Sequence, residues 1–178
     1  MSLFEATPYQ NLILTGPMGT GKTSVGRAVA TRLGARFFDL ENEILAREGQ
    51  SVESIRELFG EARVRALETT VIHDLTLNRS SVLVMTGTAL LDETNRARLA
   101  ESGAILCLTC AVNEILRRQH MARGAWFQSP ANRGAILSQL KREWRVTTLN
   151  LPQLDTSQLS LKETIEAVTD YWKTHARV

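Results

Sequence analysis

The sequence predicts a single α/β domain whose parallel sheet of five strands lies between two layers of helices. Short apolar runs, typical of buried strands, alternate with segments of helical periodicity along the 178 residues. Crossovers between parallel strands are right-handed, which puts helices on both faces of the sheet. The length suits one domain rather than two, and no low-complexity linker divides the chain, so residues 1–178 are expected to fold together.

The expected strands are short and mostly apolar. They span residues 11–15, 36–39, 81–86, 104–110 and 153–155. The third is apolar almost throughout, as in a strand that is buried on both faces of a parallel sheet. Ligands bind such sheets beyond the carboxyl ends of the strands, so the residues that follow each strand are the candidates for function.

The expected helices begin and end at recognisable residues. They span residues 22–33, 41–48, 52–58, 61–77, 92–101, 112–122, 134–147 and 161–172. Gly34 follows the first helix, as glycine often does at a helix end, and Ser51 is placed to cap the third. Residues 123–133 contain Gly124 and Pro130 and interrupt the helical pattern, so they are expected to form a lid loop.

The motif that organises the chain lies between the first strand and the first helix. It is Gly16-Pro17-Met18-Gly19-Thr20-Gly21-Lys22-Thr23, the spacing of a phosphate-binding loop. Its glycines let backbone N–H groups point at phosphate oxygens, and the following helix adds its positive end. We expect Lys22 to reach the β- and γ-phosphates of ATP and the Thr23 hydroxyl to ligate Mg²⁺. A glycine-rich turn without a ligand would not need Lys and Thr at these positions.

Two carboxylates follow the second strand, Asp39 and Glu41. The third strand is followed by Thr86-Gly87-Thr88-Ala89, which carries no acid, so the acid that orders the metal must come from elsewhere. Asp39 is the best placed, and we expect it to hold Mg²⁺ together with Thr23. An N-cap and a first-turn acid, which stabilise a helix whatever the function, are the structural alternative for this pair.

Composition and charge disfavour several classes of protein. The 43% hydrophobic and 22% charged residues are ordinary for a globular chain, and the formal net charge of +2 argues against a nucleic-acid or anionic-membrane surface. No apolar run approaches the ~20 residues that span a bilayer, and residues 1–5 lack the features of a signal sequence. We therefore expect a cytoplasmic protein.

Both cysteines fall in the motif Cys107-Leu108-Thr109-Cys110, which invites a zinc or redox interpretation. In a strand, however, a spacing of three residues points the two side chains to opposite faces of the sheet. His73, His120 and His175 are isolated and have no metal-ligand spacing. The cysteines are therefore expected to be structural.

From about Leu12 to Leu108 the residues resemble the shikimate kinases, which have a nucleoside-monophosphate-kinase-like fold. The residues that carry the resemblance are the phosphate-binding loop, Phe38-Asp39-Leu40-Glu41, Gly60-Glu61 leading to Arg65 and Glu68, Thr86-Gly87, and residues 93–99.

The resemblance implies a role for each matching residue. Asp39 would help hold Mg²⁺, and Glu41 would contact the ring hydroxyls of the acceptor and can serve as the base. Arg65 would bind the acceptor carboxylate. The turn with Gly87 and Thr88 would hydrogen-bond the acceptor, and Arg123 would close on the phosphates as a lid arginine. The product would enter aromatic amino acid biosynthesis.

The sequence departs from the family pattern mainly on the acceptor side. Glu41 replaces an aspartate, Gly87-Thr88-Ala89 replaces a glycine triplet, and Arg123-Gly124-Ala125-Trp126 replaces Arg-Pro-Leu-Leu. The Arg-x-Pro-Leu-Tyr stretch beyond the lid is absent, which leaves Arg142 or Arg145 as substitutes. Donor-side residues match better than acceptor-side residues, so phosphoryl transfer is better supported than the choice of acceptor.

Several arginines have a structural alternative. Arg65 shares its helix with Glu61 and Glu68, and a surface ion pair would explain it as well as a ligand contact does. Arg117 and Arg118 could stack on adenine or form a solvated helix flank. The residues expected to bind the cofactor are Gly16, Pro17, Met18, Gly19, Thr20, Gly21, Lys22, Thr23 and Ser24, together with Arg117 and Arg118.

The sequence is therefore interpreted as a monomeric small-molecule kinase that transfers the ATP γ-phosphate to a hydroxyl of a carboxylated polyol, with shikimate as the first candidate. The expected catalytic residues are Lys22, Asp39, Glu41 and Arg123, and the expected acceptor-binding residues are Glu41, Arg65, Gly87, Thr88 and Arg142. A gluconate or other polyol kinase is the first alternative, favoured by the lid without proline. A nucleotide-binding regulatory module without catalysis is the alternative from another class.

Overall fold

The computed structural model describes residues 6–176, within which five parallel strands form one sheet in the order β2-β3-β1-β4-β5. The strands are β1 Asn11–Thr15, β2 Arg36–Asp39, β3 Ser81–Val84, β4 Gly103–Thr109 and β5 Gln153–Asp155. The predicted parallel sheet is confirmed. The expectation about residues 1–5 lies outside the described residues.

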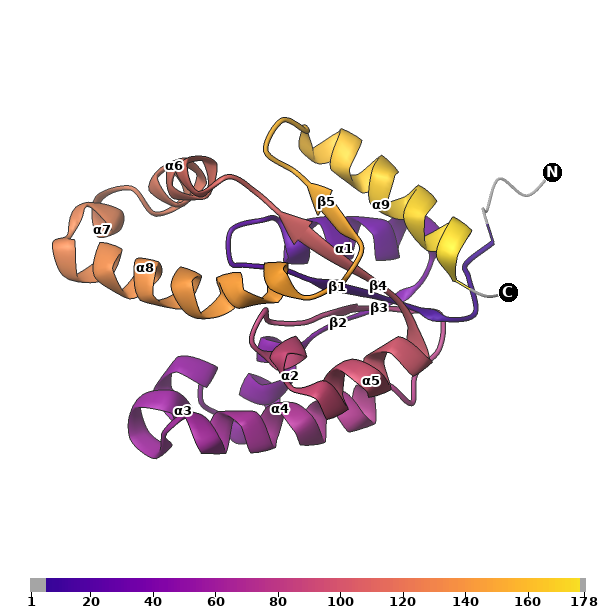
Figure 1. Cartoon of the computed structure of the whole chain (residues 1–178), viewed down its shortest axis with the longest axis horizontal. Coiled ribbons are helices and arrows are strands. Elements are labelled where there is room, and N and C mark those ends of the chain that lie inside the picture. Colours follow the sequence, from indigo (N-terminus) through magenta and orange to yellow (C-terminus); the bar gives the residue numbers. More distant parts are fainter. Residues whose placement is uncertain (1–5, 177–178) are drawn as a thin grey trace.

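Helices connect the strands and cover both faces of the sheet (Figure 1). They are α1 Lys22–Leu33, α2 Leu40–Glu48, α3 Val52–Phe59, α4 Glu61–Leu75, α5 Glu93–Ser102, α6 Val112–Arg123, α7 Ala125–Gln128, α8 Pro130–Trp144 and α9 Leu161–His175, with 3₁₀ turns η1 Ala89–Leu91 and η2 Arg145–Thr148. Gly34 ends α1 with φ 65°, and the Ser51 side chain accepts from Ser54 N–H, so both predicted helix boundaries are confirmed.

The central strand β1 is buried along its whole length and pairs with β3 and β4. Successive side chains of a strand point to opposite faces of the sheet. Leu12 and Leu14 accordingly pack in the core beneath α1 and α9, whereas Ile13 packs in the core formed with α2, α4 and α5. These two apolar layers fix the sheet and therefore the loops at its carboxyl end.

The segment 123–133, predicted to be a loop, is largely helical, so that prediction was wrong. α6 runs to Arg123, Gly124 turns the chain with φ 51°, and the short α7 follows. α8 then begins at Pro130 rather than at residue 134. Proline lacks the backbone N–H that a helix interior requires, but the first helical position does not need it, so Pro130 starts a helix here.

A third apolar cluster holds α6, α7 and α8 against the phosphate-binding loop. It contains Met18, Cys110, Ile115, Phe127, Ile136 and Leu140. Figure 1 shows α6 to α8 lying together at the same end of the molecule as the β1–α1 loop. Met18 thus links the loop to the helices that cover it, and these helices complete the walls of the site.

The two cysteines are free and buried in different clusters, Cys107 with the α2–α5 layer and Cys110 under α6. Burial raises the pKa of the Cys107 thiol to about 11, which keeps it protonated and unreactive. Among residues 6–176, no group of three or more His, Cys, Asp or Glu side chains is placed to hold a metal ion. The burial of the two thiols in separate apolar clusters agrees with structural cysteines.

Within the described part of the chain, no helix combines the length and apolar character that crossing a membrane requires.

Candidate active site

The phosphate-binding loop curls tightly between β1 and α1. Gly16 has φ 134°, and a Cβ there would lie 2.0 Å from the Leu108 carbonyl oxygen of β4, so only glycine fits. The Thr20 hydroxyl donates to the Pro17 carbonyl at 2.9 Å and closes the turn. Gly19 and Gly21 also have positive φ, and Ser24 lies exposed in the first turn of α1. The loop and helix end therefore have the geometry that the motif predicts.

The Lys22 side chain folds back across this loop. Its Nζ donates to the carbonyl oxygens of Gly16 at 2.9 Å and Pro17 at 2.8 Å. Burial lowers the pKa of the Lys22 amine, and the nearby Glu143, Glu41 and Asp39 carboxylates oppose that shift. The amine is thus held at the mouth of the loop, where a phosphate group would meet it.

Thr23 and Asp39 lie together as predicted. The Thr23 hydroxyl donates to Asp39 Oδ2 at 2.9 Å. Asp39 Oδ1 accepts from the backbone N–H groups of Glu41 and Asn42, so the same side chain caps α2. Both interpretations of Asp39 fit the geometry. A hydroxyl and a carboxylate this close are the hard oxygen ligands that suit Mg²⁺, which takes few protein ligands and completes its shell with water and phosphate.

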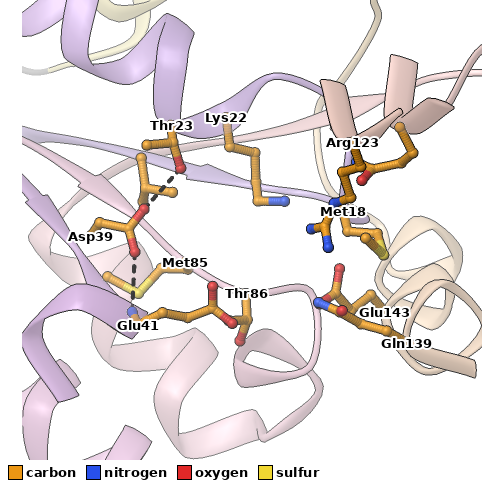
Figure 2. Close-up of a pocket in the computed structure, with 13 residues that line it drawn as sticks. Met18, Lys22, Thr23, Asp39, Glu41, Met85, Thr86, Arg123, Gln139 and Glu143 are labelled. Carbon is orange, nitrogen blue, oxygen red and sulfur yellow. Dashed lines mark hydrogen bonds between the residues drawn. The ribbon is translucent and has the colours of Figure 1, made fainter. Parts of the chain in front are cut away.

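A cavity of about 300 Å³ opens in front of the loop. Lys22, Asp39, Glu41 and Arg123 all line it, so the structure brings the four expected catalytic residues together (Figure 2). Burial raises the pKa of the Glu41 carboxyl group, and the charges of Glu143 and Asp39 raise it further. A carboxylate with a raised pKa is better suited to accept a proton than an ordinary glutamate.

Arg123 reaches the cavity from the end of α6. Its guanidinium lies 4.8 Å from the centre of the Trp126 ring, within the range of a cation–π contact. The departure from the family pattern at residue 126 therefore places an aromatic surface beside the expected lid arginine.

Sequence reasoning missed three polar residues of this cavity, Gln119 on α6 and Gln139 and Glu143 on α8. They lie on either side of the segment that was mistaken for a loop. The sequence did contain one indication that Glu143 faces the interior. Glu143 follows Ile136 and Leu140 at helical spacing, which puts an acid on the buried stripe of α8.

A second, larger cavity of about 890 Å³ holds most of the expected acceptor residues, including Arg65, Thr88 and Arg142. Lys141 and Arg145 line it as well, so four basic side chains face one space, which they share with the acids Glu61, Glu68, Asp92 and Glu93. Arg65 makes none of the ion pairs with Glu61 or Glu68 that its helix spacing allows. Glu61 pairs instead with Arg56 at 2.8 Å. Arg142 lies 3.9 Å from Glu53 of α3.

The two cavities adjoin at Thr86 and Glu68. Thr86 lines the first, Glu68 lines the second, and the Thr86 hydroxyl donates to Glu68 Oε1 at 3.1 Å. Gly87, the next residue, lies against α8, because a Cβ there would be 2.7 Å from the Glu143 carbonyl oxygen. Glu41 belongs to the first cavity and Arg65 to the second, so the expected acceptor residues span both.

Replacing Glu68 with glutamine is expected to stabilise the protein at about pH 8 and not near pH 4.5. Burial raises the pKa of Glu68 from 4.5 to about 7. The native state therefore loses stability as pH rises from the unfolded-state pKa through about 7, by roughly 3 kcal/mol. Glutamine has no proton to lose and still accepts from Thr86. Thermal melts at both pH values test this, and an equal shift at both would contradict it.

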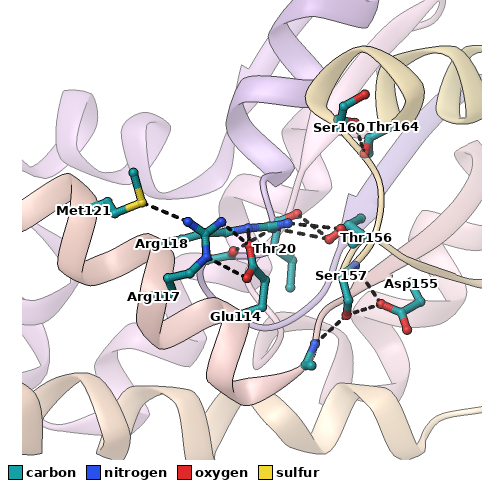
Figure 3. Close-up of polar contacts among 12 residues, drawn as sticks. Thr20, Glu114, Arg117, Arg118, Met121, Asp155, Thr156, Ser157, Ser160 and Thr164 are labelled. Carbon is teal, nitrogen blue, oxygen red and sulfur yellow. Dashed lines mark hydrogen bonds and ion pairs between the residues drawn. The ribbon is translucent and has the colours of Figure 1, made fainter.

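Arg118 ties the other end of the loop to the turn after β5. It donates to the Thr156 carbonyl oxygen at 3.0 Å and to Glu114 at 3.0 Å, and it lies 3.5 Å from the Gly19 carbonyl oxygen (Figure 3). The Thr156 hydroxyl in turn donates to the Thr109 carbonyl oxygen at 3.0 Å. Arg118 is therefore an anchor for the loop, and its stacking on adenine stays a prediction.

Arg117 lies on the outer side of the same helix and pairs with Glu114 at 2.7 Å. Hydrogen bonds from Arg117 and then Arg118 hold the pKa of Glu114 well below its usual range. More than half of the Arg117 side chain is exposed, as in the solvated helix flank that was the alternative. Its contact with adenine also stays a prediction.

Comparison with known proteins finds the same family that the sequence motifs resemble. The shikimate kinase family model matches residues 18–172. The chain is 34% identical over 168 residues to the shikimate kinase of Geobacter sulfurreducens, covering 93% of this chain and 92% of that relative. It is 45% identical over 111 residues to that of Chromobacterium violaceum, a match that spans 62% of this chain and only 60% of the relative's length.

A solved structure shows the same fold. The shikimate kinase of Acinetobacter baumannii in complex with shikimate superposes with a TM-score of 0.78 and 28% identity, over 94% of this chain and 95% of that one. The predicted resemblance and fold are confirmed, because the family model covers most of the chain. The chain belongs to the shikimate kinase family.

Proposed function

We propose that this protein transfers the γ-phosphate of ATP to a hydroxyl of shikimate, with Mg²⁺ as the metal cofactor. Family membership supports both cofactors and the acceptor. The observation that carries the proposal is a pair of adjoining cavities, the second of which contains Arg65, an arginine without a carboxylate partner among the described residues. One lies at the phosphate-binding loop and holds Glu41, and the other gathers four basic side chains. A molecule with hydroxyls at one end and a carboxylate at the other fits that arrangement.

The loop side would bind the donor. ATP supplies the phosphoryl group, and Mg²⁺ offsets charge on its phosphates. Thr23 and Asp39 would hold the metal through their oxygens. Lys22 and Arg123 would neutralise the charge that develops on the transferring group, because positioning and electrostatics account for most of the catalysis of phosphoryl transfer. Glu41 would accept the proton of the attacking hydroxyl.

The second cavity would bind the acceptor carboxylate. Arg65 has no carboxylate partner among the described residues and presents a planar guanidinium, which suits bidentate binding. Arg142 and Thr88 line the same cavity, and Thr88 belongs to the turn that follows β3. Gly87 would contribute through its backbone. All these residues come from one chain, so the proposal needs no second copy.

The test is ADP release by the purified protein with ATP and Mg²⁺, in parallel reactions with shikimate, gluconate and no acceptor. Release that depends on shikimate is the expected result. Release that depends on gluconate alone would favour the polyol-kinase alternative. Nucleotide binding without turnover on either acceptor would indicate a non-catalytic nucleotide-binding protein.

Replacing Arg65 with methionine is expected to raise the KM for shikimate by about 100-fold while the KM for ATP stays within about twofold. Methionine keeps the bulk of the side chain but removes both hydrogen bonds to a carboxylate. Arg63→Met is the matched control, since Arg63 lies on the same helix and, among residues 6–176, pairs with the surface residue Glu48 at 3.2 Å. An equal effect of the two substitutions would contradict a role for Arg65 in acceptor binding.

A further inference from the structure

We propose that Glu143 is a specificity-determining residue of the acceptor site, whose free carboxyl oxygen accepts a hydrogen bond from an acceptor hydroxyl on the side of the cavity opposite Glu41. The inference rests on the proposed kinase function and adds a residue that the family pattern does not supply. Figure 2 shows the two glutamates facing each other across the cavity, with Lys22 and Arg123 nearer the loop.

The first observation is an unpartnered buried oxygen. The Glu143 side chain is only 5% exposed, and its Oε1 accepts from Gln139 Nε2 at 2.9 Å. Its Oε2 is buried and has no hydrogen-bond partner. Buried polar atoms are almost always paired, so an acceptor atom left free in a cavity wall indicates a donor that arrives with a ligand.

A second buried atom without a hydrogen-bond partner belongs to a residue that lines the same cavity. Among the described residues, the other buried side-chain atom without a partner is Gln119 Oε1, and Gln119 also lines the cavity at the phosphate-binding loop. Packing alone does not account for Glu143. It occupies the buried stripe of α8 with Ile136 and Leu140, where an apolar side chain would be more stable. The acid is thus placed at a cost to stability and faces the reacting groups.

Charge indicates the kind of donor. Asp39, Glu41 and Glu143 share the cavity with Lys22 and Arg123, and the negative charge of Glu143 affects both Lys22 and Glu41. A further anionic group of the acceptor would be repelled here and would be better placed in the second cavity beside Arg65, which has no carboxylate partner among the described residues. A hydroxyl donates a hydrogen bond without adding charge. Glu143 therefore selects an acceptor with a hydroxyl at this position.

The backbone of Glu143 helps to fix the position of its carboxyl group. Its backbone packs directly on Gly87, the residue after Thr86, at a distance that allows no side chain on Gly87. This contact fixes the C-terminal part of α8 over the turn that follows β3. The carboxyl group is therefore held in place by the backbone below it and by Gln139 beside it, as a group that discriminates between acceptors must be.

The test compares the wild type with Glu143→Met, which keeps the chain length and removes the acceptor atoms. With shikimate we expect KM to rise roughly 10- to 100-fold, with the KM for ATP unchanged within about twofold. We also expect the melting temperature to rise by about 2–4 °C, because a buried polar atom without a partner is lost. Glu101→Met, an exposed acid of α5, is the matched control and should change none of these.

Shikimate analogues that each lack one hydroxyl make the assignment specific. For one of these analogues, the KM of the wild type should be roughly 10- to 100-fold higher than the KM for shikimate. Glu143→Met should lose the preference for shikimate over that analogue and keep its preference over the other analogues. Equal losses against every analogue, or a change confined to the KM for ATP or the Mg²⁺ requirement, would overturn the assignment.

Calorimetry separates this inference from the proposed function. If the wild type releases no ADP with shikimate, the proposed function fails, and the analogues are then titrated into the protein loaded with ADP and Mg²⁺. The same discrimination in Kd, lost in Glu143→Met, would still support the role of Glu143. Uniform Kd values, or no binding of shikimate, would overturn it.

Discussion

Replacing Lys22 with methionine is expected to lower kcat for acceptor-dependent ADP release by about 10³-fold or more, a loss of at least about 4 kcal/mol of transition-state stabilisation. The Lys22 amine donates to the Gly16 and Pro17 carbonyls at the mouth of the loop and lines the cavity where the phosphates would lie. Methionine has similar length and no charge. Steady-state kinetics with saturating shikimate and ATP measure the effect.

The loss should appear in the chemical step more than in folding. The substitution removes the two hydrogen bonds from the amine to the loop, but it also removes the cost of burying that amine, and the Thr20–Pro17 hydrogen bond remains. A melting temperature close to that of the wild type would therefore accompany the lost activity. Lys162→Met, an exposed lysine of α9, is the control and should leave kcat unchanged. A kcat within about tenfold of wild type in Lys22→Met would show that the amine does not stabilise the transition state.

The donor side of the site was predictable because its residues are close in sequence. The strand, the glycine-rich turn and the helix that follow one another fix where Lys22 and Thr23 lie, and the spacing of the motif reports this local geometry directly. Asp39 was predictable for a related reason. It ends β2, and parallel strands bring their carboxyl ends to one edge of the sheet, so it meets Thr23 there.

The α8 side of the site was not predictable in the same way. Pro130 indicates a break in most helical patterns, and only the folded chain shows that it occupies the first position of a helix. The face that α8 turns to the cavity depends on packing against Met18 and Ile115, which are far from it in sequence. Glu143 was visible only as an acid on an apolar stripe, a signal that also fits an exposed edge of a helix.

The glycine after β3 illustrates how one residue can fit two explanations. The resemblance implied that Gly87 approaches the acceptor through its backbone. In the folded chain its missing side chain is already required by the close approach of Glu143, whatever binds nearby. A family pattern therefore predicts which positions are constrained better than it predicts the contact that constrains them.

Replacing Asp39 with asparagine is expected to separate its two roles. Asparagine caps helices about as well as aspartate, so Oδ1 should still accept from Glu41 and Asn42, and the melting temperature should stay within about 2 °C of wild type. The charge beside Thr23 is lost, however. We expect kcat/KM at low Mg²⁺ to fall about 100-fold and to recover partly when Mg²⁺ is raised, because the weakened site fills by mass action.

Two further variants complete the comparison. Asp39→Ala removes the cap as well as the charge and should add a loss of about 1 kcal/mol, or about 3 °C, to the loss of activity. Ser160→Ala removes the cap of α9, whose side chain accepts from Glu163 N–H at 3.2 Å far from the loop, and should lower stability alone. If Asp39→Asn keeps the wild-type Mg²⁺ dependence, Asp39 serves only as a helix cap. The metal would then depend on Thr23 and the phosphates, because the other acids of the cavity, Glu41 and Glu143, are assigned to the acceptor hydroxyls.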